Sequence, residues 1–162
     1  MTKTLSDFTH INSSDQPKMV DVGAKKITKR QATGKAMMFL GKEIISLLEG
    51  NELKTKKGPV FQTAIIAGIQ AVKKTSDLIP MCHPLLIHGV DISIEILDSE
   101  HIELFCTVKI EGKTGVEMEA LTGVNIAALT VYDMCKSISQ KMSIKEVVLV
   151  KKSGGKSDIN KI

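Results

Sequence analysis

The clearest structural signal in the chain is the stretch from residue 90 to residue 110, VDISIEILDSEHIELFCTVKI. It contains two runs in which apolar and polar residues alternate, 90–97 and 101–110, separated by Asp98-Ser99-Glu100. Because successive side chains of a strand point to opposite faces of a sheet, each run predicts a strand with one apolar face. The short polar spacer predicts that the two strands pair as a hairpin.

The apolar positions of the two runs define the face of the sheet that we expect to lie on a core. They are Val90, Ile92, Ile94, Ile96, Ile102, Leu104, Cys106, Val108 and Ile110. Polar residues occupy the positions between them, so the opposite face is expected to be open to solvent.

A helix is predicted over residues 121–140, which are rich in Ala, Val, Ile and Leu. Its apolar residues recur at the three-and-four spacing of one buried helical face, at Ala127, Val131, Met134, Cys135 and Ile138. A membrane-spanning helix of this length would not comfortably carry Asn125, Asp133 and Lys136, so a buried helix of a globular domain is the better interpretation.

The remaining predicted helices and strands complete the order of elements along the chain. We predict a strand over 32–40, a short helix over 42–50, a second helix from about residue 61 to 74, and a last strand over 146–152. The order along the chain is then β-α-β-β-α-β. This order predicts an α+β fold of the ferredoxin-like type, with an antiparallel sheet and helices packed on one face.

No repeat or linker divides the chain into several units. We expect an irregular N-terminal arm over residues 1–30, a ferredoxin-like catalytic domain over 31–152 and a flexible C-terminal tail over 153–162. The first eighteen residues contain no apolar stretch of signal-peptide length. The expected location is therefore the cytoplasm.

The composition of the chain limits the kinds of ligand that we expect it to bind. The chain has 162 residues and a net charge of +4, but only 3% of its residues are aromatic, with no Trp and one Tyr. Base stacking on single-stranded nucleic acids is therefore poorly supported, and a small phosphorylated ligand suits the lysines better. Cys82, Cys106 and Cys135 form no Cys-x-x-Cys pair, and we expect three free thiols in a reducing compartment.

Residues 113–136, KTGVEMEALTGVNIAALTVYDMCK, carry charged side chains at the two ends of an apolar run. Glu117 and Glu119 flank Met118, and in an extended segment both carboxylates would lie on one face. Asp133 and Lys136 are three residues apart, so on a helix they lie within reach of each other. The run could be the core of an active site, or it could carry a solvated acidic pair and a surface ion pair.

His83 precedes Pro84, which favours an extended conformation in a short loop, and it follows Cys82. Adjacent residues rarely chelate one ion, so a metal site is not supported by this spacing. Cys82 could be a nucleophile activated by a nearby cation. Since neighbours in an extended loop seldom face each other, a buried, unreactive cysteine is the competing interpretation.

Residues 153–157, SGGKS, lack the earlier glycine of a phosphate-binding P-loop and lead into a polar tail. Two glycines can still let backbone N–H groups approach an anion, while Lys152 and Lys156 supply positive charge; the alternative is a disordered tail. Lysines at 57, 73, 136, 152 and 156, with one histidine and three carboxylates, suit acid-base chemistry on a polyphosphorylated molecule.

Four motifs in series resemble the MoaC family, the cyclic pyranopterin monophosphate synthases of molybdenum cofactor biosynthesis. They are TAIIAGIQAVKKTSDLIPMCHPL (63–85), KTGVEMEALT (113–122), VYDMCKSI (131–138) and KKSGGKS (151–157). The likeness runs from Thr9-His10-Ile11 to about Ser157. Two departures are Ile65, where many members have arginine, and Asp158, which follows Ser157 without the usual glycine.

The resemblance implies a lyase whose ferredoxin-like subunits form a homohexamer, a trimer of dimers with active sites at the subunit interfaces. The implied substrate is 3′,8-cyclo-7,8-dihydro-GTP, which the family rearranges to cyclic pyranopterin monophosphate while releasing pyrophosphate. The resemblance implies no redox cofactor. The spacing and composition described above lead us to expect no metal, no nucleic-acid partner and no membrane.

Site residues follow from the same resemblance. The implied catalytic residues are Asp133, Lys136 and Lys57. The implied substrate-binding residues are Met81, Cys82, His83, Met118 and Glu119, and, matched less closely, Glu117, Lys73, Arg30, Lys152 and Lys156.

A nucleotide- or RNA-binding module without catalysis is the alternative, because ferredoxin-like sheets often bind RNA. Such modules stack bases on paired aromatic residues of the open sheet face. The hairpin here offers only Phe105 on that face, so the sequence favours the enzyme.

Overall fold

The computed structural model describes residue 14 and residues 16–161 of the chain. The two alternating runs form the predicted hairpin, with β5 (Gly89–Ile96) and β6 (His101–Gly112) paired antiparallel. Asp98 closes the turn between them, because its Oδ1 accepts the backbone N–H groups of Glu100 at 2.7 Å and His101 at 2.8 Å.

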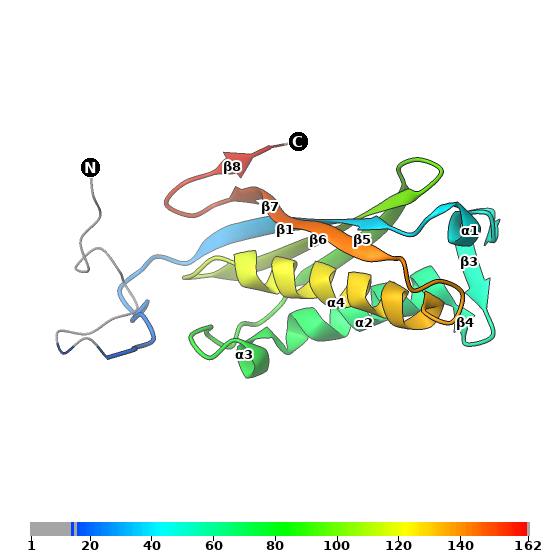
Figure 1. Ribbon diagram of the computed structural model, residues 1–162. Coiled ribbons are helices and arrows are strands. Elements are labelled where there is room, and N and C mark those ends of the chain that lie inside the picture. Colours follow the sequence, from blue (N-terminus) through cyan, green and yellow to red (C-terminus); the bar gives the residue numbers. More distant parts are fainter. Residues whose placement is uncertain (1–13, 15, 162) are drawn as a thin grey trace.

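The hairpin is one edge of a five-stranded sheet (Figure 1). β6 pairs with β1 (Thr28–Phe39), β1 with β7 (Ser143–Ser153), and β7 with the short β8 (Ile159–Asn160), all antiparallel. The strand order is β5-β6-β1-β7-β8. Without β8 this is the strand order of a ferredoxin-like sheet, so the predicted α+β fold class is confirmed.

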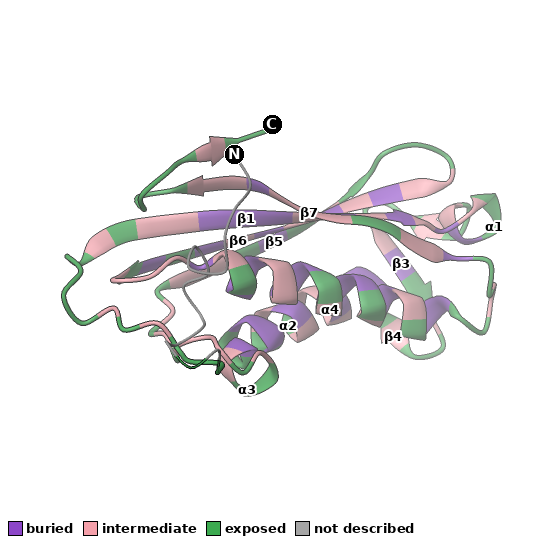
Figure 2. Cartoon of the chain, turned by 60° about the vertical axis from the view of Figure 1, so that its left-hand side comes forward, coloured by how far each residue is buried: buried purple, intermediate pink, exposed green. Residues whose placement is uncertain are grey.

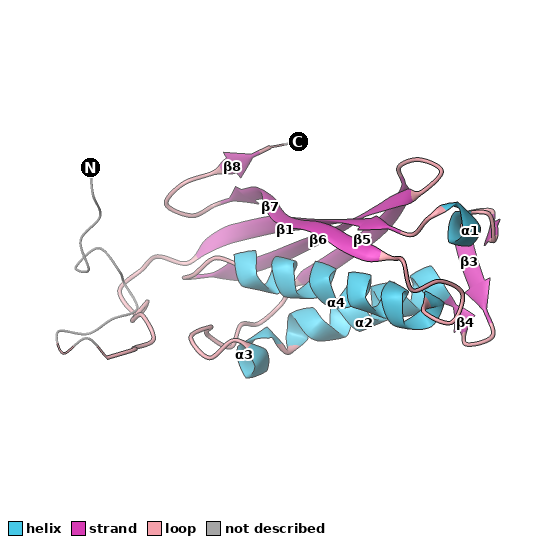
Figure 3. Cartoon of the chain, in the orientation of Figure 1, coloured by secondary structure: helices cyan, strands magenta, loops and turns pink. Residues whose placement is uncertain are grey.

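Two long helices lie side by side on one face of the sheet (Figure 3). They are α2 (Val60–Lys73) and α4 (Glu117–Cys135). Their apolar residues meet those of the strands in one core, so that the purple, buried side of α4 faces the sheet in Figure 2. Four of the five residues predicted for the buried face of α4 are buried, whereas Ile138 lies beyond its end and is half-buried.

α4 begins four residues before the predicted position. The prediction was wrong here because Val116, the residue that precedes the helix, has no side chain that can cap it, so the sequence lacks a start signal. Gly34 of β1 allows the helix to approach the sheet closely. A Cβ at this position would lie 2.9 Å from the backbone oxygen of Ala120.

The short helix predicted over 42–50 is also largely wrong. Only α1 (Lys42–Ile45) is helical, and the chain continues into a second, three-stranded sheet. Its strands are β2 (Leu48–Glu49), β3 (Glu52–Thr55) and β4 (Gly58–Pro59). Strands of two to four residues are too short to show alternation, and Gly50 at φ +62° reverses the chain between the first two. A further turn of helix, α3 (Thr75–Leu78), follows α2.

The face of the large sheet away from the helices is polar, as the alternation predicts. Lys35 and Glu103 form an ion pair there, and the hydroxyls of Thr33 and Thr107 are 2.8 Å apart. Among the described residues, no helix is both long and apolar enough to cross a membrane.

The expected division of the chain at residues 30 and 152 stays a prediction. Residues 1–13 and 15 of the N-terminal arm, which include Thr9-His10-Ile11, lie outside the described residues. Residues 153–162 contain β8, a strand too short to be recognised in the sequence.

Candidate active site

Asp133 lies between two ammonium groups at the C-terminal end of α4. Its Oδ1 is 2.7 Å from Lys136 Nζ, and its Oδ2 is 3.1 Å from Lys57 Nζ. Lys57 also donates to the backbone oxygen of Asp133 at 2.9 Å. The structure therefore brings together the three residues implied as catalytic, and their side chains are about half exposed, at 46% for Lys57, 56% for Asp133 and 54% for Lys136.

Two elements position this cluster. Lys136 directly follows the last helical residue, so it pairs with Asp133 at the predicted (i, i+3) spacing. Lys57 comes from the turn between β3 and β4, which lies beside the end of α4 (Figure 1). The unpaired carbonyl groups and the dipole at a helix C-terminus favour a cation at this position.

The charge state of the cluster limits what it can do. The pKa of Asp133 is held below its usual range because Lys136 and Lys57 donate hydrogen bonds to its carboxylate. The same hydrogen bond raises the pKa of Lys136. At neutral pH the cluster is thus one carboxylate with two ammonium groups, which can donate protons and stabilise developing negative charge. Asp133 becomes a stronger base only when one of the lysines moves away from it.

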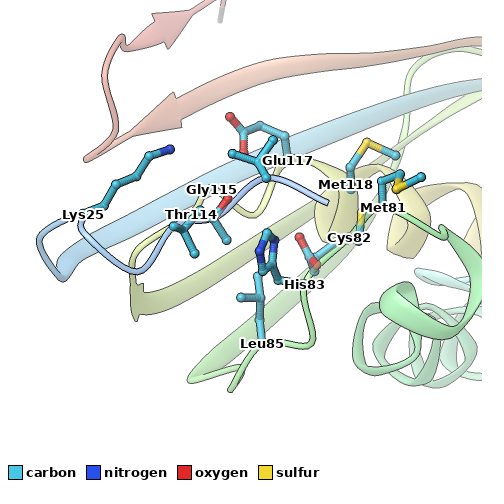
Figure 4. Close-up of a pocket in the computed structure, with 12 residues that line it drawn as sticks. Lys25, Met81, Cys82, His83, Leu85, Thr114, Gly115, Glu117 and Met118 are labelled. Carbon is cyan, nitrogen blue, oxygen red and sulfur yellow. The ribbon is translucent and has the colours of Figure 1, made fainter. Parts of the chain in front are cut away.

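A cavity of about 280 Å³ lies at the other end of α4 (Figure 4). The loop after α3 contributes Met81, Cys82 and His83 to its wall, and the first turn of α4 contributes three more of the side chains that were implied to bind substrate. These are Glu117, Met118 and Glu119. The cavity therefore combines sulfur-containing and apolar groups with a histidine and two carboxyl groups.

The two glutamates do not share a face, and the prediction that they would was wrong. Because they lie in the first turn of a helix and not in a strand, a separation of two residues directs them to different sides. Glu117 Oε1 accepts a hydrogen bond from Lys152 Nζ at 3.2 Å, whereas the side chain of Glu119 is buried. Burial raises the pKa of Glu119, and the nearby Glu117 carboxylate raises it further.

Cys82 is half-buried, and its thiol is free. Burial raises its pKa, and so does the negative charge of Glu119. A reactive cysteine needs the opposite shift, so the site does not favour Cys82 as a nucleophile. The thiols of Cys106 and Cys135 are also free and are buried in the core, where burial raises the pKa of Cys106 to about 12.

A second cavity, of about 160 Å³, gathers the cationic residues. Arg30 of β1, Lys152 of β7 and Lys156 of the loop before β8 line it together with Glu117. Glu117 therefore borders both cavities. Lys73 adjoins the main cavity from another side, since it borders a small hollow that also touches His83 and Glu119.

Some residues of the main cavity were not identified from the sequence. Val20, Val22 and Lys25 reach it from the N-terminal arm, and Thr114 comes from the loop before α4. The arm has no periodic pattern that would place it over a cavity. The only signal was the basic pair at residues 25 and 26, which resembles the other lysine-bearing loops of the chain.

One chain does not bring together the residues implied as catalytic and those implied to bind substrate. From Glu117 to Asp133 there are sixteen residues of continuous helix, which at 1.5 Å per residue is about 24 Å. The cluster around Asp133 and the cavities therefore lie at opposite ends of α4, too far apart to act on the same atoms of one small molecule.

Comparisons with known proteins agree on one family. The model of the MoaC family matches residues 19–155, a range that includes all of the candidate site residues except Lys156. A cyclic pyranopterin monophosphate synthase from Peptoclostridium acidaminophilum is 49% identical over 151 residues, which cover 93% of this chain and 94% of the relative. One from Helicobacter pylori (strain HPAG1) is 51% identical with the same coverage.

A longer relative is a molybdenum cofactor biosynthesis bifunctional protein from Synechocystis sp. It is 52% identical over 157 residues, which cover 94% of this chain. The match covers only 45% of that relative, so this chain corresponds to about half of its length.

Proposed function

The chain belongs to the MoaC family, and we propose that it is a lyase that rearranges 3′,8-cyclo-7,8-dihydro-GTP to cyclic pyranopterin monophosphate and releases pyrophosphate, a step of molybdenum cofactor biosynthesis. The observation that carries the proposal is the carboxylate of Asp133 held between Lys57 and Lys136. A rearrangement that opens and closes rings needs protons delivered and removed at several steps, and this cluster holds groups of both kinds.

The cavities suit the two parts of such a substrate. Arg30, Lys152 and Lys156 supply the positive charge that a triphosphate needs, and charge-assisted hydrogen bonds to phosphate are among the strongest available. As pyrophosphate leaves, the same cations stabilise the charge that builds up on it. The more apolar cavity beside Met81 and Met118 suits the ring system, which His83 and Glu119 can orient through hydrogen bonds.

The proposal includes a homohexamer, a trimer of dimers, in which each active site lies between subunits. Its support is the separation of about 24 Å between the two halves of the site along α4. Contact between copies would also cover exposed apolar side chains on the helices, since Ile66 of α2 is 60% exposed and Leu129 of α4 is 54% exposed. Light scattering of the purified protein tests the number of subunits.

We propose that the reaction uses no redox cofactor, because it rearranges bonds and moves protons without a net transfer of electrons. The proposed partners are the cyclised nucleotide and further copies of this chain, with no nucleic acid and no membrane. The proposed location is the cytoplasm.

The test is to incubate the purified protein with the cyclised GTP intermediate and to follow pyrophosphate and the pterin product. We expect both to appear together, in equal amounts. If the folded protein binds the nucleotide but forms neither product, the chain is a nucleotide-binding module and the proposal is wrong.

A further inference from the structure

Lys57 is presented by a small hairpin made of β3 and β4. Residues 56 and 57 form the two-residue turn between β3 and β4, in which Thr55 pairs with Gly58. Gly58 has a φ of +112°, a conformation that residues with a side chain rarely adopt. The direction of the Lys57 side chain therefore depends on where this hairpin is held.

Thr55 closes the turn locally. Its hydroxyl oxygen accepts the backbone N–H of Lys57 at 3.1 Å, and the hydroxyl group lies 3.5 Å from the backbone oxygen of Gly58. Such hydrogen bonds from a side chain to nearby backbone stabilise a turn. They fix the shape of the hairpin but not its position relative to α4.

Glu52, the first residue of β3, attaches the hairpin to α2. Its Oε1 accepts the backbone N–H of Phe61 at 2.8 Å, and its Oε2 accepts that of Gln62 at 3.1 Å. The residue that precedes α2 is Pro59, whose side chain has no acceptor, so these N–H groups need a partner from elsewhere. The negative charge of Glu52 also suits the N-terminus of a helix.

The attachment of the hairpin to α2 also fixes the position of Lys57 relative to Asp133. α2 packs against α4 along its length, and α4 carries Asp133. The hairpin is fixed to α2 by Glu52 on its β3 side and by the chain itself on its β4 side, since Val60 follows Pro59. Lys57 Nζ then meets both the backbone oxygen and Oδ2 of Asp133, within 3.1 Å of each.

We infer that Glu52 is a positioning residue, whose carboxylate caps α2 and thereby holds the β3–β4 hairpin so that the Lys57 ammonium lies against Asp133. The inference rests on the proposed catalytic role of Lys57. Glu52 touches neither Lys57 nor Asp133, and it acts through the hairpin and through α2.

The test compares Glu52→Ala and Glu52→Gln with the control Glu49→Ala. Glu49 lies in β2 of the same small sheet and forms a surface ion pair with Lys54 at 2.9 Å, so its removal takes a carboxylate from the sheet without uncapping α2. Gln keeps one acceptor oxygen, and we expect its effect to lie between those of wild type and Glu52→Ala.

With the cyclised nucleotide as substrate, we expect Glu52→Ala to lower kcat by about tenfold or more, because misplacing a catalytic group by about 1 Å can cost roughly a hundredfold. We expect KM to stay within about twofold, because the cavities lie at the other end of α4. All measurements are made well below the melting temperature of each variant, so that lost stability alone does not lower the rate.

A second readout does not need substrate. Carbon NMR can follow the titration of the Asp133 carboxyl, whose pKa is low partly because Lys57 donates to it. We expect this pKa to rise in Glu52→Ala towards its value in Lys57→Met, and to stay unchanged in Glu49→Ala. A loss of helix stability without movement of Lys57 would leave the titration as it is in wild type.

The inference is overturned if Glu52→Ala has a kcat within about twofold of Glu49→Ala and an unchanged Asp133 titration. If wild type forms no product, the proposed function fails, and the Asp133 titration alone decides whether Glu52 positions Lys57. If Glu52→Ala does not fold, the same two measurements on Glu52→Gln decide.

Discussion

The carboxylate of Asp133 collects hydrogen bonds from two lysines that reach it by different routes. Lys136 is its neighbour on the helix, and this pairing follows from spacing alone. Lys57 lies 76 residues earlier in the chain, and no pattern of apolar or charged residues predicts that contact. Only the resemblance to a family assigned Lys57 and Asp133 to the same catalytic set, and the contact between them is seen only in the structure.

At this residue we predict that Asp133→Asn lowers the single-turnover rate by roughly 10²- to 10⁴-fold, the usual contribution of general acid-base catalysis. Substrate affinity and melting temperature should stay close to wild type, because the side chain is exposed and distant from the cavities. Glu49→Gln is the matched control, since it neutralises an equally exposed carboxylate paired with a lysine. Equal rates for the two variants would leave Asp133 a surface ion pair.

Because the carboxyl group of Glu119 is buried, we expect the free energy of unfolding to depend on pH. Its pKa is raised by burial, so the folded state favours the protonated form. A group of this kind stabilises the fold below the pKa that it has in the unfolded chain, and that contribution is lost as pH rises through the folded pKa. We therefore predict that Glu119→Gln, whose side chain stays neutral, has a higher free energy of unfolding than wild type at neutral pH.

Urea denaturation at a series of pH values tests this prediction. The difference in unfolding free energy between Glu119→Gln and wild type should shrink as pH falls, because the wild-type carboxyl then becomes neutral as well. A difference that does not change with pH would show that the carboxylate is not destabilised by its surroundings.

At the scale of elements, the long periodic segments were predictable and the short ones were not. The hairpin and the body of α4 follow from apolar periods that persist over eight or more residues. β2, β3 and β4 are too short to contain a period, although they carry Lys57. The sequence therefore predicts the scaffold of the site better than the turn that presents Lys57, the lysine that we propose to be catalytic.

The start of α4 shows how one element decides the geometry of a site. The segment Glu117-Met118-Glu119 is compatible with a strand or a helix, and Val116 gives no capping signal. Since the segment is helical, Glu117 pairs with Lys152 and Glu119 turns into the protein. An error of four residues at a helix end was enough to assign the two carboxylates to one face.

The contact between α4 and the sheet predicts the effect of Gly34→Ala. The new methyl group would lie 2.9 Å from the backbone oxygen of Ala120, and a helix backbone cannot yield as a flexible side chain can. We expect a loss of about 1–3 kcal/mol of unfolding free energy, the usual cost of overpacking. Substrate affinity should also fall, because the shifted turn carries Met118 and Glu119.

Gly89→Ala is the control for this prediction, because a Cβ there would meet its nearest neighbour, the Cβ of Lys109, at 4.0 Å. Both glycines lie in strands, so the two substitutions differ chiefly in the contact with α4. Unfolding free energies measured by chemical denaturation show whether the two variants differ in stability. If Gly34→Ala is as stable as Gly89→Ala, the close approach does not matter for the fold.

At the scale of the whole molecule, the periodicity of the sequence predicts the sheet and helices, whereas only the resemblance to a family implied a site shared between subunits. The charged residues at the two ends of 113–136 were identified together, yet a continuous helix separates them by about 24 Å. Two copies related by a twofold axis can bring opposite ends of the same helix together, because such an interface places each copy's surface against the other. The proposed activity requires that each active site be divided between subunits in this way.

Mixing subunits tests that division most directly. Asp133→Asn removes the proposed catalytic carboxylate and His83→Ala removes a group proposed to orient the ring system, so each variant alone should turn over the cyclised nucleotide poorly. If one active site takes these groups from two different subunits, reassembling equal amounts of the two variants in random pairs restores about a quarter of the sites. We predict recovery of about a quarter of wild-type turnover, with exchange of subunits confirmed by native mass spectrometry. Mixed assemblies that form fully but show no more activity than the separate variants would contradict the account.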